Sequence, residues 1–168
     1  MAAKALVWSV VVILIGGGLA SGNDLTPNEQ LGKSIFFDTN LSINKNQSCA
    51  ACHAPEAGWT GPIEFINMTG GVYEGSVPGR FGNRKPPSSA YATVSPIFHY
   101  QIEKQEALFI GGNFWDGRAT GEKLGNPAAD QAQGPFLNPV EQASPDNACI
   151  VYEVCTTDSY PVSFEEVW

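Results

Sequence analysis

Hydrophobic residues follow a helical period over only short stretches of this chain. Leu31 and Ile35 are four residues apart and share one face of a helix, with a phenylalanine adjoining. Thr26 can cap that helix, a proline follows it at the first turn, and Glu29 completes a capping box. The pattern predicts an amphipathic helix over residues 27–37.

The longest apolar run lies at the N-terminus and has the features of an export signal. Lys4 supplies a positive charge, residues 5–15 are apolar, and Gly18 and Ala20 suit a cleavage site. The run is short for a membrane-spanning helix of roughly 20 residues. We expect residues 1–20 to be a signal peptide and the protein to be periplasmic, with an uncleaved membrane anchor as the alternative.

Glycine and proline interrupt the hydrophobic pattern in the remainder, residues 21–168. The chain has 18 Gly and 12 Pro, and residues 54–90 are rich in both. A loop of that length inside a domain is usually functional or packed on a ligand. We therefore expect a single, mostly α domain of short helices and long loops.

Composition narrows the range of functions. The chain has 168 residues, of which 43% are hydrophobic and 15% charged, as expected for one globular domain. Its net charge of −8 excludes nucleic acid as a partner and suits a cationic redox protein.

The central motif is C-x-x-C-H, formed by Cys49, Cys52 and His53. It is the attachment signature of c-type haem, in which the thiols add to the vinyl groups and the histidine binds the iron. A redox CxxC pair or half a zinc site is the alternative, but neither a second CxxC nor a βαβ pattern accompanies the motif. The motif predicts one covalent haem c in a cytochrome c-like domain.

A second iron ligand could come from Met68 or His99, because Met1 would leave with the signal. Met68 lies in an irregular loop, where its alternative role is to fill a gap. His99 lies in an aromatic segment that we expect to be partly buried, where a structural role is favoured. The remaining option is an open distal face, which can bind peroxide.

Three more stretches carry a family resemblance. They are Leu-Gly-Lys-Ser-Ile-Phe-Phe-Asp at 31–38, Phe-Trp-Asp-Gly-Arg-Ala at 114–119 and Gln-Ala-Gln-Gly-Pro-Phe-Leu-Asn-Pro-Val-Glu at 131–141. With C-x-x-C-H, they resemble the bacterial di-haem cytochrome c peroxidases, which include the methylamine-utilisation di-haem enzymes. The resemblance covers roughly residues 25–168 and implies the N-terminal, peroxidatic haem domain.

The resemblance assigns a distal pair to Gln131 and Glu141, with Pro135 between them. Cleavage of an O–O bond needs a base that takes a peroxide proton and returns it to the leaving oxygen. A carboxylate near an apolar haem face can have its pKa raised into that role, and an amide can orient the peroxide without titrating.

Further roles follow from the same resemblance. Trp115 corresponds to a tryptophan in the electron path between two haems. Arg118 either pairs with a haem propionate or forms a structural pair with Asp116 or another acid. Asn83 is the nearest match to a calcium-binding asparagine, one position out of register.

The chain also departs from the family. It contains no second C-x-x-C-H, so the second haem domain is absent from this sequence. We expect the chain to be either the N-terminal half of a longer enzyme or a truncated relative. No histidine after His53 corresponds to the one that blocks the resting haem in some members. Cys149 and Cys155 are six residues apart, and we expect them to form a disulfide.

We therefore expect an exported peroxidase domain that reduces hydrogen peroxide to water. Its electrons would come from a small cytochrome c or copper protein, and homodimer formation is left open. The main alternative is a non-enzymatic mono-haem electron-transfer cytochrome c with Met68 on the iron. An oxidant of another protein is a third alternative.

Overall fold

A computed structural model describes residues 25–157 and 160–167, so the predicted signal peptide lies outside the described residues. The first helix, α1 (Pro27–Phe37), has the predicted bounds. Thr26 Oγ1 accepts from the Glu29 N–H at 3.3 Å, and Glu29 Oε2 accepts from the Thr26 N–H at 2.8 Å. Both halves of the capping box are present, and Leu31 points into the core at 3% exposure.

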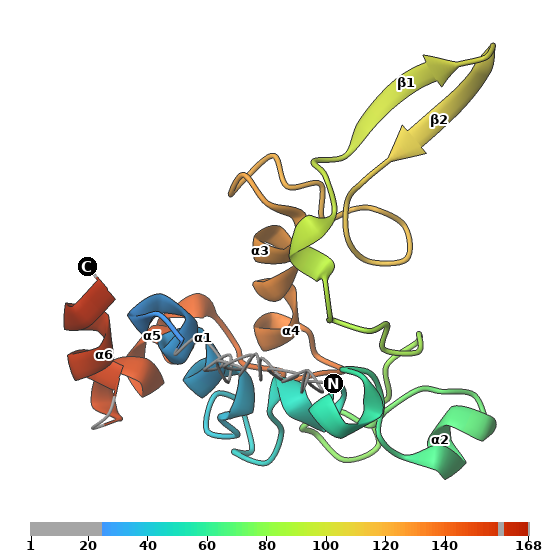
Figure 1. Cartoon of the computed structure of the whole chain (residues 1–168). Helices are drawn as coiled ribbons and strands as arrows, with labels where there is room; N and C mark the ends of the chain where they lie inside the picture. The colour runs from blue at the N-terminus through green and yellow to red at the C-terminus, as the bar shows by residue number, and fades with distance from the viewer. Residues whose placement is uncertain (1–24, 158–159, 168) are drawn as a thin grey trace, which may run out of the picture.

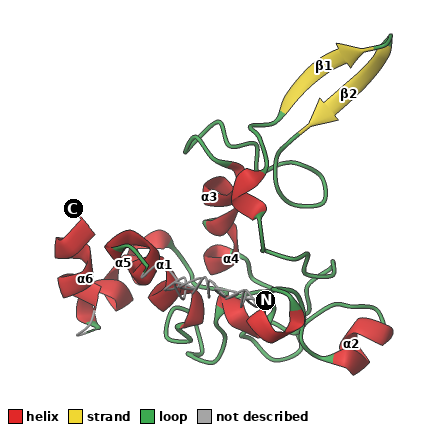
Figure 2. Cartoon of the chain, in the orientation of Figure 1, coloured by secondary structure: helices red, strands yellow, loops and turns green. Residues whose placement is uncertain are grey.

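The other helices are short and are separated by loops, as Figure 2 shows. They are α2 (Glu64–Met68), α3 (Pro127–Ala132), α4 (Gly134–Leu137), α5 (Asn147–Thr156) and α6 (Tyr160–Val167). Single 3₁₀ turns occur at 49–51, 55–57 and 92–94. The prediction of a mostly helical domain is confirmed in part, because the chain also forms a small sheet. None of the helices in the described ranges has the length and apolarity needed to cross a membrane.

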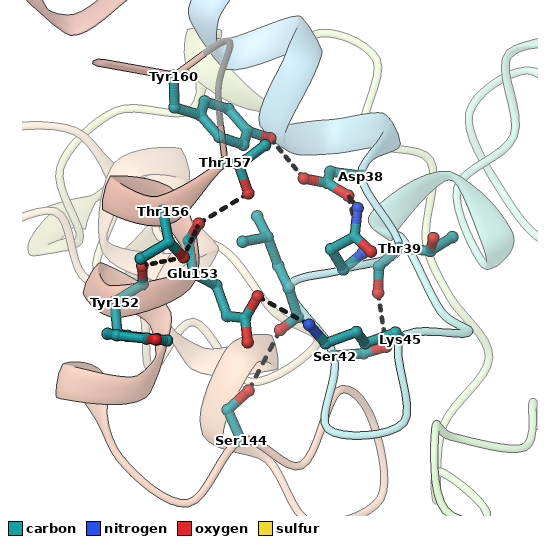
Figure 3. A network of polar contacts seen from close by, with 12 residues as sticks. Asp38, Thr39, Ser42, Lys45, Ser144, Tyr152, Glu153, Thr156, Thr157 and Tyr160 are labelled. Atoms are coloured by element: carbon teal, nitrogen blue, oxygen red, sulfur yellow. Dashed lines mark hydrogen bonds and ion pairs between the residues drawn. The ribbon is translucent and has the colours of Figure 1, made fainter.

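Helices α1, α5 and α6 lie together at one end of the molecule (Figure 1). The Tyr160 hydroxyl is buried and donates to Asp38 Oδ2 at 2.9 Å (Figure 3). Ser144 Oγ also donates to the Leu41 carbonyl at 3.2 Å, and Leu41 is almost fully buried. These contacts fix the segment that leads from α1 to the C-x-x-C-H motif.

The sheet is a two-stranded antiparallel hairpin of β1 (His99–Glu103) and β2 (Glu106–Ile110). It projects away from the helices (Figure 1), and both strands are mostly exposed. The expectation that the segment around His99 is partly buried is therefore wrong. The strands pair with each other and present their side chains to solvent.

The predicted disulfide is also wrong. Cys149 and Cys155 are free, exposed thiols, and both belong to α5. Six residues of α-helix separate two Cα atoms by about 9 Å along the axis. A disulfide needs a Cα separation of about 4.4–6.8 Å, so the helix must be broken before the two sulfurs can bond.

Candidate haem site

A cavity of about 550 Å³ lies between α1, α3, α4 and the loops that follow the C-x-x-C-H motif. Cys49, Cys52 and His53 all line it. Its size falls within the roughly 300–1,000 Å³ of small-molecule and cofactor sites.

The local fold of the motif brings its three side chains to one wall. The 3₁₀ turn at Cys49–Ala51 lets the backbone N–H groups of Cys52 and His53 both donate to the Cys49 carbonyl, at 3.2 and 3.0 Å. Burial raises the pKa of the Cys49 thiol to about 11 and that of the Cys52 thiol to about 12, and the nearby Glu141 carboxylate adds to both shifts. Both sulfurs therefore stay as protonated thiols at neutral pH.

The protonation of His53 follows from its neighbours. Its Nδ1 lies 3.2 Å from the Trp59 carbonyl oxygen and 3.0 Å from the Pro87 carbonyl oxygen. Two acceptors face this nitrogen, so Nδ1 carries the hydrogen and Nε2 presents its lone pair. Burial also lowers the pKa of His53, which keeps the ring neutral and able to bind a metal.

These residues fit a covalent haem c. Two thiols can add to vinyl groups, and the imidazole lone pair beside them can bind iron. Two buried glutamines, Gln47 and Gln142, line the same cavity, and the Oε1 atom of each lacks a hydrogen-bond partner among the described residues. Unpartnered buried oxygens indicate a cavity wall that meets a further group, such as water or a ligand.

The predicted distal residues reach this cavity from a second wall. Gln131 lies on α3, Pro135 on α4 and Glu141 in the turn that follows, and all three line the cavity. The sequence analysis missed Asn138, whose Nδ2 donates to Glu141 Oε1 at 2.7 Å. Its position before a proline and three residues before Glu141 was the available signal.

Glu141 lines the cavity and is partly buried, with its carboxylate hydrogen-bonded to Asn138. Burial raises its pKa, although the Asn138 hydrogen bond and the charge of Arg118 act in the opposite direction. A carboxylate with a raised pKa can accept a proton near neutral pH and release it again.

Trp115 and Arg118 lie on adjoining parts of the lining. Trp115 is 64% exposed, and its Nε1 donates to the Lys85 carbonyl at 3.0 Å. Arg118 Nη1 lies 2.8 Å from both oxygens of Asp116, and its guanidinium stacks 3.7 Å from the centre of the Phe114 ring. The structural ion pair considered for Arg118 is thus present, and Arg118 still lines the cavity.

The structure brings neither predicted sixth ligand to the site. Met68 ends α2 with 78% of its surface exposed, and it does not line the cavity. His99 lies on the hairpin, where its Nδ1 contacts the Ile97 carbonyl oxygen at 2.8 Å. Asn83 does line the cavity, but the described residues contain no cluster of three His, Cys, Asp or Glu side chains suited to a metal ion.

Comparisons with known proteins agree with this site. The sequence matches the family described as "Di-haem cytochrome c peroxidase" over residues 26–168. It is 37% identical to the methylamine utilization protein MauG of Paracoccus denitrificans, covering 82% of this chain and 33% of that protein. It is 32% identical to the cytochrome c peroxidase Ccp of Escherichia coli, covering 68% and 18%.

Solved structures are similar as well. The diheme peroxidase BthA from Burkholderia thailandensis superposes with a TM-score of 0.69 at 29% identity, covering 86% of this chain and 35% of BthA. A variant of BthA superposes with a TM-score of 0.72 at 30% identity, covering 84% and 33%. The chain thus spans about a third of the length of MauG and of BthA.

Proposed function

Because the chain belongs to the di-haem cytochrome c peroxidase family, we propose that it is the c-type haem domain at which hydrogen peroxide is reduced to water. The observation that carries this proposal is the cavity itself. Its lining includes the haem-attachment residues and, from α3 and the turn after α4, Gln131 and Glu141.

The bound haem supplies a redox-active iron, and the chain supplies positioning and proton transfer. His53 would bind the iron through Nε2, because its Nδ1–H is committed to two carbonyl oxygens. Gln131 orients the peroxide. Glu141 would take a proton from one peroxide oxygen and return it to the other, which would leave as water. The net reaction consumes one peroxide, two electrons and two protons and yields two waters.

Electrons reach the site through the exposed Trp115. We propose a small cytochrome c or copper protein as the donor, since the net charge of −8 attracts a cationic partner. Such a donor and a covalent haem both fit an exported, periplasmic protein.

The non-enzymatic electron-transfer alternative requires Met68 on the iron. It is disfavoured because Met68 is exposed and lies outside the cavity lining. A ferric absorption spectrum of the haem-loaded chain separates the two functions. The peroxidase proposal expects a high-spin band that changes on adding peroxide, whereas a long-wavelength methionine–iron charge-transfer band would refute it.

Turnover is then measured as peroxide-dependent oxidation of a reduced small cytochrome c by the haem-loaded chain. The matched control is the Glu141→Gln variant with the same haem content. Equal turnover rates for the wild-type and Glu141→Gln proteins would refute the proposed proton transfer by Glu141.

A further inference from the structure

Positive charge gathers at the haem cavity. The chain has nine Lys and Arg residues in all, and three described ones, Arg84, Lys85 and Arg118, line this single cavity. The protein as a whole carries a net charge of −8. A cavity that concentrates cations in an acidic protein is suited to an anionic ligand.

One acid, Asp116, contacts both arginines of this group. Asp116 accepts from Arg118 Nη1 at 2.8 Å and lies 3.5 Å from Arg84 Nη2. The bond from Trp115 Nε1 to the Lys85 carbonyl, 3.0 Å long, joins the same two segments of chain. The loop of Arg84 and Lys85 and the segment of Arg118 are therefore held in one fixed arrangement.

The two segments both contribute to the cavity lining. The Pro87 carbonyl contacts His53 Nδ1, which puts the loop of Lys85 on the side of the iron ligand. Arg118 lines the same cavity, where its guanidinium stacks 3.7 Å from the centre of the Phe114 ring. The cations thus reach the cavity from two segments of the chain.

Lys85 is the one of these three cations that has no carboxylate partner among the described residues. Its side-chain stem packs beside Gly71, and in the described part of the chain no acid lies within ion-pair distance of its ammonium. The two carboxylates that line the cavity, Glu74 and Glu141, each accept a hydrogen bond from a neighbouring N–H group. Arg84 and Arg118 share one acid, Asp116, and Lys85 has none, so these three cations are suited to further carboxylate groups.

We propose that Arg84, Lys85 and Arg118, positioned by Asp116, form a carboxylate clamp for the two propionate groups of the haem. Vinyl and propionate groups occupy opposite edges of the porphyrin, so a haem held through its vinyl groups leaves two carboxylates to be neutralised. Guanidinium and ammonium groups suit them. The clamp rests on the covalent haem of the proposed function and is independent of the peroxide chemistry.

The test uses the haem-loaded chain with Arg84→Gln and Lys85→Gln. The matched control is Arg80→Gln, in the same loop but outside the cavity lining. Resonance Raman spectroscopy reports the propionate-bending band, and potentiometry reports the haem midpoint potential. We expect the band to shift and the potential to fall in both variants and not in the control, because losing a nearby positive charge favours ferric over ferrous iron.

Lys85→Arg keeps the charge and should retain the wild-type band and potential. A band and potential in Arg84→Gln and Lys85→Gln that match those of Arg80→Gln would overturn the clamp. Peroxide turnover is not used as a readout. A shifted band in a protein that has no turnover would support the clamp and refute the peroxide proposal. An unshifted band in a protein that turns over peroxide would refute the clamp and support the peroxide proposal.

Discussion

Replacing Glu141 by glutamine removes the group proposed to transfer the proton and should leave the fold unchanged. The amide oxygen of glutamine can still accept from Asn138 Nδ2, which lies 2.7 Å from Glu141 Oε1, so the side chain keeps its position. The one other described carboxylate that lines the cavity, Glu74, is engaged in a hydrogen bond with the Gly79 N–H. Among the described residues, no further carboxylate lines the cavity.

General acid–base catalysis contributes about 10²–10⁴-fold to rate. We expect peroxide turnover by Glu141→Gln to fall by this factor, equivalent to about 3–5 kcal/mol of activation barrier. Haem content and thermal stability should stay at their wild-type values. The matched control is Glu74→Gln, which also removes a cavity carboxylate and should change turnover little.

The pH dependence gives a second measurement of the same residue. Burial raises the pKa of Glu141. Its ionised form is the proposed proton acceptor. Wild-type turnover should therefore fall as the pH drops through a pKa above the ordinary carboxyl range, and this acid limb should be missing from Glu141→Gln. Turnover at the wild-type rate in Glu141→Gln, with the acid limb intact, would refute the reasoning.

The remaining predictions concern the haem, the thiols and the packing of α6. His53→Ala should lose the haem absorption spectrum or the fold, measured by absorbance and circular dichroism, and a wild-type spectrum would exclude His53 as the ligand. Cys149 and Cys155 should both react with a thiol reagent in the native, haem-loaded protein, since both are exposed on α5; an unreactive native protein would contradict this. Tyr160→Phe removes the 2.9 Å hydrogen bond to Asp38. It should lower the free energy of unfolding by about 1 kcal/mol in urea titrations, and an unchanged midpoint would show that this bond contributes nothing.

The features that could be predicted from sequence are those with a local signal. The capping box of Thr26 and Glu29 defines the start of α1 because each group satisfies the other's backbone N–H. Residues 131–141 were predicted to supply a distal pair, and both side chains line the cavity with His53. Their catalytic roles stay predictions.

The errors arose where the deciding contacts are not local. The hairpin turns through Lys104 and Gln105, which have φ of 49° and 71°. Such turns usually carry Asn or Gly, so the sequence offered no hairpin signal. The disulfide prediction rests on the six-residue spacing of Cys149 and Cys155, whereas Asp146 caps a helix that separates these two residues. Met68 is a candidate ligand by sequence because the chain has only two Met and two His, but at the end of α2 it is exposed to solvent.

The two carbonyl groups that face His53 Nδ1 would also set the electronic character of this imidazole as the proposed iron ligand. A carboxylate in that position would draw the proton away and make the imidazole a stronger donor to iron. Carbonyl oxygens carry no net charge, so the ring remains neutral imidazole and ferric iron gains less from it. Both oxygens belong to the backbone, so the effect on the balance between ferric and ferrous iron would depend on the backbone conformation at Trp59 and Pro87. Substitutions of the Trp59 side chain would leave it in place.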